Sequence, residues 1–201
     1  MICAIVLAAG ESRRMGSQKL LLPFGGKTVI AHVVDELLRS DLDAAYVVVG
    51  HEGNRISEEL SRRPVTVVPN PDYKVGMLSS LRCGLQALPQ QCEKVLVALG
   101  DQPAITSELV NHMVQSFSTP EKGILVPLHR GKRGHPILFL IRYRHEIMTC
   151  FGKVGLRGLL QAHPDDIFEL TVSTPAALSD MDHPEDYKRE LTSFEENPQK
   201  G

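Results

Sequence analysis

Residues 1–10 read Met1-Ile-Cys-Ala-Ile-Val-Leu-Ala-Ala-Gly10, an apolar run that ends at a glycine. Its apolar residues are consecutive, which is the pattern of a strand covered on both faces. The run is too short to cross a bilayer and lacks the basic residues of a secretory leader. We therefore expect a buried β-strand over Ile2–Ala8 and a loop from Gly10 onward.

Similar runs alternate with helical patterns along the rest of the chain. Further strands are expected at Ala45–Gly50, Val65–Val68, Lys94–Leu99, Ile124–Pro127, Pro136–Ile141 and Ile167–Val172. Apolar residues recur at helical spacing over residues 29–38, 78–88, 109–117 and 156–160. This alternation predicts an α/β fold, a three-layer α/β/α sandwich with a mainly parallel, Rossmann-like sheet. The loops after the strands then share one edge, where such folds bind ligands.

Size and composition fit one domain. The chain has 201 residues, of which 42% are hydrophobic, enough for one substantial core. We expect a single domain over residues 1–192 and a frayed polar tail over residues 193–201. The segment Gly131–Gly134 is interpreted as an exposed turn between two strands.

Charge, hydropathy and cysteine usage exclude several classes of partner. The formal net charge of −2 lacks the basic excess of a nucleic-acid binder. No apolar run reaches membrane length, so no membrane partner is expected. The four cysteines form no close pair and the histidines show no zinc spacing, which favours a cytoplasmic protein without disulfides or zinc.

The loop after the first strand indicates phosphate chemistry. It reads Leu7-Ala-Ala-Gly-Glu-Ser-Arg-Arg-Met-Gly-Ser-Gln-Lys19, with small residues that let a ligand approach the backbone. Successive N–H groups of such a loop form a nest for anionic oxygens, and its arginines and lysine add positive charge. The glycine spacing fits neither a Walker A loop nor a dinucleotide fingerprint. A plain strand–helix turn with solvated arginines remains the alternative on these residues alone.

The pattern Leu-Ala-Ala-Gly-x-Ser-x-Arg-Met-Gly-x-x-Lys over residues 7–19 resembles the signature of the nucleotidyltransferase superfamily. Within it the chain looks like the MobA-like branch, and most like the molybdenum cofactor cytidylyltransferases. The likeness continues, in family order, through residues 20–23, Asn70 and residues 76–81, 99–103, 134–136 and 182–186. The resemblance implies Mg²⁺-dependent transfer of CMP from CTP onto the phosphate of molybdopterin, with release of pyrophosphate.

The resemblance also assigns the reacting groups. Lys19 and Arg14 would stabilise charge on the transferring phosphoryl group, and Asp101 would bind Mg²⁺ at the end of the expected strand 94–99. Asp182 matches the family's second metal ligand. His183 replaces the threonine that usually follows it, and Asp180 remains an alternative ligand.

The expected nucleotide site joins two parts of the sequence. It comprises Leu7, Ala8, Ala9, Gly10, Ser12, Arg13, Arg14, Met15, Gly16, Lys19, Asn70, Gly76, Ser79, Ser80 and Asp101. The two serines could instead be simple helix caps. CTP-using relatives tend to have Ala-Ala-Gly where guanylyl-transferring relatives have Ala-Gly-Gly, and the Cβ of Ala9 would crowd a purine. CTP is therefore favoured over GTP.

A phosphorylated small molecule is the expected acceptor, bound by Arg133, Gly134, His135 and Pro136, although a structural role for the histidine is an alternative. Another NTP or a sugar or alditol phosphate acceptor would preserve the same chemistry. A non-catalytic chaperone that serves a molybdenum hydroxylase is the more distant alternative. The complete set of Lys19, Asp101 and Asp182 argues against it.

Overall fold

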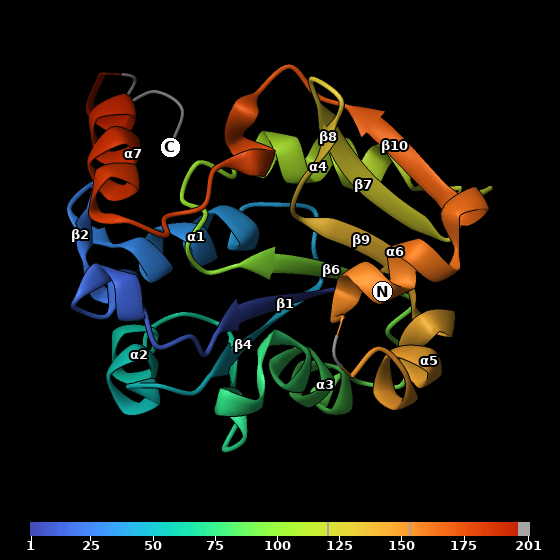
Figure 1. Ribbon diagram of the computed structural model, residues 1–201, viewed down its shortest axis with the longest axis horizontal. Helices are drawn as coiled ribbons and strands as arrows, with labels where there is room; N and C mark the ends of the chain where they lie inside the picture. Colours follow the sequence, from blue (N-terminus) through green and yellow to red (C-terminus); the bar gives the residue numbers. More distant parts are fainter. Residues whose placement is uncertain (120, 153, 197–201) are drawn as a thin grey trace.

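A computed structural model describes residues 1–119, 121–152 and 154–196, and its central layer is one mixed sheet (Figure 1). The strand order is β10-β7-β9-β6-β1-β4-β5, and β8 pairs with β7. The bounds are β1 Ile2–Ala8, β4 Ala44–Val49, β5 Thr66–Pro69, β6 Lys94–Leu99, β7 Ile124–His129, β8 Lys132–Arg133, β9 Ile137–Leu140 and β10 Ile167–Thr171. Only β9 of that path runs antiparallel to its neighbours. The predicted α/β fold with a mainly parallel sheet is confirmed.

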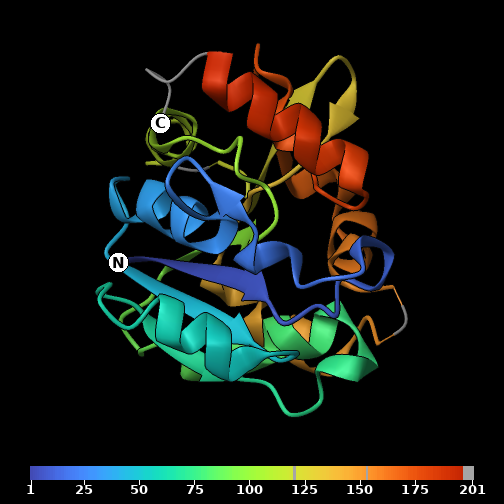
Figure 2. The ribbon, with the colours of Figure 1, turned by 90° about the vertical axis from the view of Figure 1, so that its left-hand side faces the viewer.

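Helices cover both faces of the sheet (Figure 2). The side chains of β1 therefore enter a core on each face, which explains why the sequence of this strand is apolar throughout. Cys3 and Ile5 belong to one core, which α3, α5 and α6 complete, whereas Ala4 and Val6 belong to the other, with α1, α2 and α4. The helices are α1 Val29–Leu38, α2 Gly53–Glu59, α3 Met77–Ala87, α4 Ser107–Ser116, α5 Arg144–Thr149, α6 Leu156–Ala162 and α7 Pro184–Glu196. Short 3₁₀ turns are η1 Arg13–Met15, η2 Lys19–Leu21, η3 Tyr73–Val75, η4 Ile141–Tyr143, η5 Pro164–Asp166 and η6 Pro175–Leu178.

The bounds of the predicted elements are largely confirmed. β1 and β6 have the predicted ends, and the other predicted strands differ by one or two residues. The short strands β2 Pro23–Phe24 and β3 Lys27–Thr28 were not predicted, because two residues carry no periodicity. The expected turn over 131–134 is narrower than predicted, since Lys132 and Arg133 pair with β7.

The expectation of a frayed tail from Ser193 is wrong for residues 193–196, because α7 continues through Glu196. The Phe194 ring packs on Phe24, with ring centroids 4.9 Å apart. The Tyr187 hydroxyl donates a hydrogen bond of 2.6 Å to the Pro23 carbonyl. A helix that is polar overall is thus held by aromatic side chains on one face. Residues 197–201 lie outside the described residues.

The structure also bears on membrane-spanning helices and on the state of the cysteines. Within the described residues, no helix is both long enough and apolar enough to cross a membrane. The four cysteines carry free thiols, and Cys3 and Cys92 are buried.

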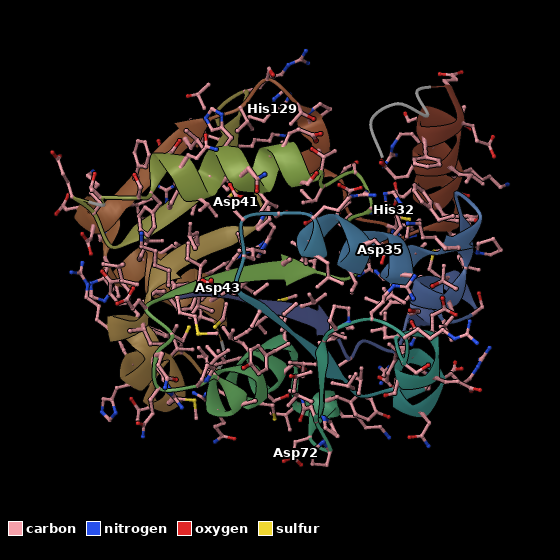
Figure 3. All side chains as sticks on the ribbon, turned by 180° about the vertical axis from the view of Figure 1, so that it is seen from behind. His32, Asp35, Asp41, Asp43, Asp72 and His129 are labelled. Carbon is pink, nitrogen blue, oxygen red and sulfur yellow. The ribbon has the colours of Figure 1, made fainter. Side chains whose placement is uncertain are left out.

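The imidazole of His32 on α1 is buried and packs against the rings of Phe24 and Phe194 (Figure 3). Burial lowers its pKa from 6.5 to about 4. Because the folded state then binds fewer protons than the unfolded state, the free energy of unfolding should fall as the pH drops from 6.5 toward 4. In His32→Phe this fall should be shallower, as measured by urea unfolding across that range. Parallel pH profiles for the two proteins would contradict the assignment.

Candidate active site

The loop between β1 and η2 is built around one buried side chain. Ser12 and Gly16 adopt left-handed backbone angles, with φ of 52° and 69°, and η1 lies between them. The Gln18 amide accepts a hydrogen bond from the Ser12 hydroxyl at 2.7 Å and donates to the carbonyls of Gly10 at 3.1 Å and His51 at 3.3 Å. Gln18 is only 5% exposed, so it fixes the loop from within.

Sequence reasoning missed Gln18. A glutamine in a polar loop is normally solvated, and nothing in the local pattern indicates burial. The only sequence feature that points to a role for Gln18 in the site is its position next to Lys19. In the structure, the Lys19 N–H donates a hydrogen bond of 3.2 Å to the Ser12 hydroxyl. Gln18 and Ser12 together place Lys19 at the start of η2.

Lys19 lies at the centre of a charged cluster drawn from three distant segments. Its ammonium contacts the Asp101 carboxylate and lies 3.3 Å from Asp182 Oδ1. The Arg14 guanidinium lies 3.0 Å from Asp182 Oδ2. The side chains of Lys19 and Asp101 are 13% and 17% exposed, so their charges interact with little screening. The predicted groups are therefore brought together.

The backbone around the second carboxylate fixes its position. The Met181 N–H donates to the Asp101 carbonyl at 3.2 Å, and the Met181 side chain is fully buried. The N–H groups of Asp182 and His183 both donate to the Asp186 carboxylate, at 3.2 and 2.8 Å. These bonds, of which the one from His183 contributes most, lower the pKa of Asp186. His183 thus helps to position this segment through its backbone N–H. Of the two candidate carboxylates, Asp182 contacts Lys19 and Asp180 does not.

A cavity of about 600 Å³ opens beside this cluster at the carboxyl edge of the sheet. Eleven residues of the expected nucleotide site line it: Leu7, Ala9, Gly10, Ser12, Arg13, Arg14, Met15, Lys19, Gly76, Ser80 and Asp101. The rest of the lining consists of Glu11, Gln18, Leu20, Tyr73, Lys74, Met77, Leu99, Asp180 and Asp182. The loop and the carboxylates therefore face one ligand-sized space.

The other four residues expected in the nucleotide site do not line this cavity. The side chain of Ala8 lies in the core, and Gly16 closes the loop. The Asn70 amide donates to the hydroxyls of Ser79 and Ser80, each at 2.9 Å, and its carbonyl accepts from the Asp72 N–H at 2.9 Å. This network is internal, so Asn70 and Ser79 hold the segment before α3 in place.

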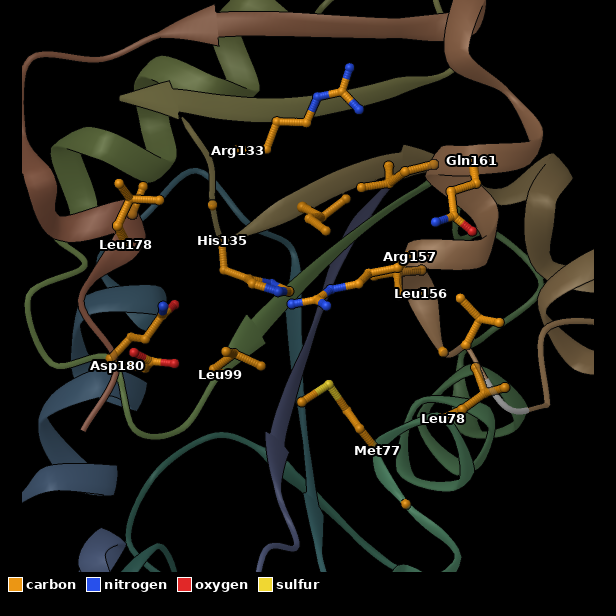
Figure 4. A pocket seen from close by; sticks show the side chains of 18 of the residues that line it. Met77, Leu78, Leu99, Arg133, His135, Leu156, Arg157, Gln161, Leu178 and Asp180 are labelled. Carbon is orange, nitrogen blue, oxygen red and sulfur yellow. The ribbon is translucent and has the colours of Figure 1, made fainter. Parts of the chain in front are cut away.

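A second cavity of about 760 Å³ adjoins the first (Figure 4). The two share Gly76, Met77, Leu99 and Asp180. Of the expected acceptor residues, Arg133, Gly134 and His135 line the second cavity and Pro136 does not. A Cβ on Gly134 would lie 2.0 Å from the Ala177 carbonyl oxygen, so only glycine fits there.

Arg133 and His135, the two ionisable residues among the expected acceptor residues, have different surroundings. Arg133 Nε donates to Glu169 of β10 at 2.7 Å. Burial lowers the pKa of His135, so its imidazole is neutral at pH 7. Among the described residues, no group pairs with His135 Nδ1 or with Gln102 Oε1, although both atoms are buried. Both residues line the second cavity.

The donor set suits a hard cation that is shared with phosphate. Asp101 and Asp182 already converge on one cation, the Lys19 ammonium. Within the part of the chain that the structure describes, no group of three or more His, Cys, Asp or Glu could enclose a metal alone. Mg²⁺ typically binds one or two carboxylates and completes its shell with phosphate oxygens and water. The two aspartates fit that requirement.

Comparison with known protein families shows to which family the chain belongs. The model of the MobA-like NTP transferase domain matches residues 4–167. The chain belongs to this family. Members of it transfer nucleotidyl groups, and in this MobA-like protein the cluster of Lys19, Asp101 and Asp182 lines the first cavity.

Individual relatives agree over nearly the whole chain. The molybdenum cofactor cytidylyltransferase of Escherichia coli K12 is 28% identical, over 92% of this chain and 93% of that protein. A nucleotidyl transferase from Methanothermobacter is 27% identical with a TM-score of 0.85, covering 98% of this chain and 99% of that one. The Mycobacterium tuberculosis H37Rv protein Rv0371C, solved with manganese, is 25% identical with a TM-score of 0.79, over 96% and 98% of the two chains. This MobA-like protein is a nucleotidyltransferase.

Proposed function

We propose that this MobA-like enzyme transfers CMP from CTP to the phosphate of molybdopterin and releases pyrophosphate. The observation that carries the proposal is the pair of adjoining cavities, which share Leu99 and Asp180 beside the charged cluster. One cavity then holds the nucleotide and the other the acceptor, with the reacting groups at their junction. The named activity of the Escherichia coli relative supports the choice of CTP and of acceptor.

The reaction needs no nucleophile from the protein. An oxygen of the acceptor phosphate, already anionic at neutral pH, attacks the α-phosphorus of CTP. The bond from the α-phosphorus to the bridging oxygen breaks on the opposite side, and pyrophosphate leaves with that electron pair. The enzyme's contribution is to align the two phosphates and to stabilise the negative charge that builds up between them.

Each part of the first cavity has a role in this step. The N–H groups of the loop after Gly10 bind the β- and γ-phosphates, as anion-binding loops do. Lys19 and Arg14 place positive charge next to the transferring phosphoryl group. Asp101 and Asp182 would hold Mg²⁺, which supplies further charge neutralisation at the phosphates.

The lining of the second cavity favours a ring-bearing acceptor over a sugar or alditol phosphate. Apolar side chains dominate its wall: Val75, Met77, Leu78, Leu99, Ile137, Val154, Leu156, Leu160 and Leu178. An acyclic polyol would leave hydroxyls unpaired against this surface, which costs free energy. A flat ring system with N–H donors would instead cover the apolar wall and satisfy Gln102 Oε1.

The choice of base is testable at Ala9, which lines the nucleotide cavity next to Tyr73. In Ala9→Gly we expect the ratio of activity with GTP to activity with CTP to rise, because the wall recedes by one methyl group. A contact of that size changes discrimination by roughly tenfold to two-hundredfold. Competition between the two nucleotides in one reaction reports the ratio.

Ala8→Gly is the matched control for this ratio. It adds the same backbone freedom one residue earlier, but the Ala8 side chain faces the core and not the cavity. Its GTP-to-CTP ratio should stay at the wild-type value. If Ala9→Gly is active with an unchanged ratio, base selection does not depend on Ala9.

The proposed nucleotide specificity is tested most simply by pyrophosphate release with each of the four NTPs, in the presence of molybdopterin and Mg²⁺. CTP should give the fastest release. Preferred use of a purine nucleotide would contradict the proposal.

A further inference from the structure

The second cavity must offer positive charge if a phosphate is to enter it. An acceptor phosphate carries up to two negative charges and approaches a triphosphate, so a cation at its binding site is needed to offset the repulsion. Among the described residues that line this cavity, the basic side chains that are charged at neutral pH are Arg133 and Arg157. His135 is neutral there because burial lowers its pKa.

The Arg133 guanidinium is directed away from the cavity and already forms an ion pair. It lies on β8, and its guanidinium donates at 2.7 Å to the Glu169 carboxylate. Figure 4 shows this guanidinium extending away from His135. The charge of Glu169 offsets that of Arg133, so this arginine offers an incoming phosphate little net attraction.

Arg157 has the opposite arrangement. It lies on α6, and in Figure 4 its side chain extends across the cavity toward His135. Besides burial, the charge of Arg157 contributes to the lowered pKa of His135. Within the described residues it forms neither an ion pair nor a hydrogen bond, so the donors of its planar fork are available. Leu99, which both cavities share, lies in the same part of the close-up.

The helix that carries Arg157 is held firmly. A Cβ on Gly158 would lie 2.4 Å from the Phe151 ring, so α6 packs closely against the segment that precedes it. Arg82 of α3 donates to the carbonyls of Ile147 at 3.0 Å and Cys150 at 2.7 Å, which ties that segment to α3. Leu159 is fully buried. A site built on a fixed helix can position a ligand accurately.

We propose that Arg157 binds the phosphate of the acceptor, and that Arg133 does not. This rests on the proposed function, since it assumes that the second cavity receives a phosphomonoester. A guanidinium fork matches two phosphate oxygens and fixes both their position and their orientation. Arg157 thereby holds the attacking phosphate at the junction of the cavities, while His135 Nδ1 and Gln102 Oε1 are left for the rest of the acceptor.

The first experiment uses inorganic phosphate as the probe and needs no acceptor. The nucleotide cavity is filled with the α,β-methylene analogue of CTP and Mg²⁺, and phosphate binding to the complex is measured by ³¹P NMR titration. Wild type should bind phosphate, and Arg157→Leu should weaken binding by at least about tenfold, the scale of losing hydrogen bonds to a charged group. Arg157→Lys should lie between them because it keeps the charge without the fork.

Arg133→Leu tests the rival arginine, and Arg62→Leu is the matched control, an exposed arginine on a turn that lines neither cavity. Both should bind phosphate within about twofold of wild type. The proposal is overturned if wild type binds no phosphate, if Arg157→Leu binds it like wild type, or if Arg133→Leu loses as much.

The second experiment separates this proposal from the proposed function. With CTP and molybdopterin, Arg157→Leu should raise the KM for the acceptor by roughly tenfold to a hundredfold and change the KM for CTP by no more than about twofold. An equal rise in both KM values would contradict an acceptor contact. If wild type transfers nothing to molybdopterin while the phosphate titration behaves as expected, the acceptor is wrong and the role of Arg157 stands.

Discussion

Asp101→Ala should abolish detectable transfer and leave the fold intact. Its carboxylate contacts Lys19 in the first cavity and its side chain is 17% exposed, so its loss removes no packing from the core. The backbone tie from the Met181 N–H to the Asp101 carbonyl does not involve the side chain and should persist. The loss of activity follows because Asp182 alone would hold Mg²⁺ too weakly to align the phosphates.

Pyrophosphate release and thermal unfolding of the same preparation measure the two halves of this prediction. Asp101→Asn should be nearly as inactive, since it keeps the shape but loses the charge. Asp41→Ala, an exposed aspartate elsewhere on the surface, should keep wild-type activity. A folded Asp101→Ala protein with full activity would remove Asp101 from the proposed metal site.

Lys19→Ala should lower kcat by roughly two to three orders of magnitude, the usual scale for losing one electrostatic stabiliser of a transition state. The dissociation constant for MgCTP should change much less, because in the proposed complex the loop N–H groups and Arg14 would still contact the triphosphate. Single-turnover rates at saturating CTP, together with equilibrium binding of the α,β-methylene analogue, separate these two quantities.

Lys27→Ala is the matched control for this variant. Lys27 pairs with Asp35 at 2.7 Å and lines neither cavity, so its loss removes a partly buried ion pair without touching the site. It should keep the wild-type kcat. If Lys19→Ala instead loses binding and rate in equal measure, Lys19 is a ground-state contact and not a transition-state stabiliser.

The fold was largely predictable because its central strands are buried on both faces. β1 and β6 are flanked by strands on each side and by helices above and below, so their sequences are apolar throughout and their ends are clear. The pairs β2–β3 and β7–β8 involve strands of two residues, for which no pattern exists. Phe194 was misjudged because one aromatic residue in a polar segment gives no signal before its partners are known.

The site was predictable where one local motif specifies it. Arg14, Lys19, Asp101 and Asp182 come from sequence blocks of the family, and the fold brings them together. The internal roles of Asn70 and Gln18 depend on burial, which their sequence neighbours do not reveal.

The acceptor side was harder to predict because it depends on long-range contacts. The direction of Arg133 depends on Glu169, thirty-six positions later in the chain. Arg157 lies on a short helix and carries no motif of its own in the sequence blocks that identify the family. Which arginine faces the cavity follows only from the packing of α6.

The most direct test of the account is mass spectrometry of the product formed from CTP, molybdopterin and Mg²⁺. The account predicts a product heavier than molybdopterin by one cytidylyl group, formed in equal amount to pyrophosphate and absent when CTP or the acceptor is omitted. Asp101→Ala run in parallel should give neither product. Pyrophosphate release without a cytidylylated pterin, or a nucleotidylated sugar or alditol phosphate as the favoured product in an acceptor mixture, would contradict it.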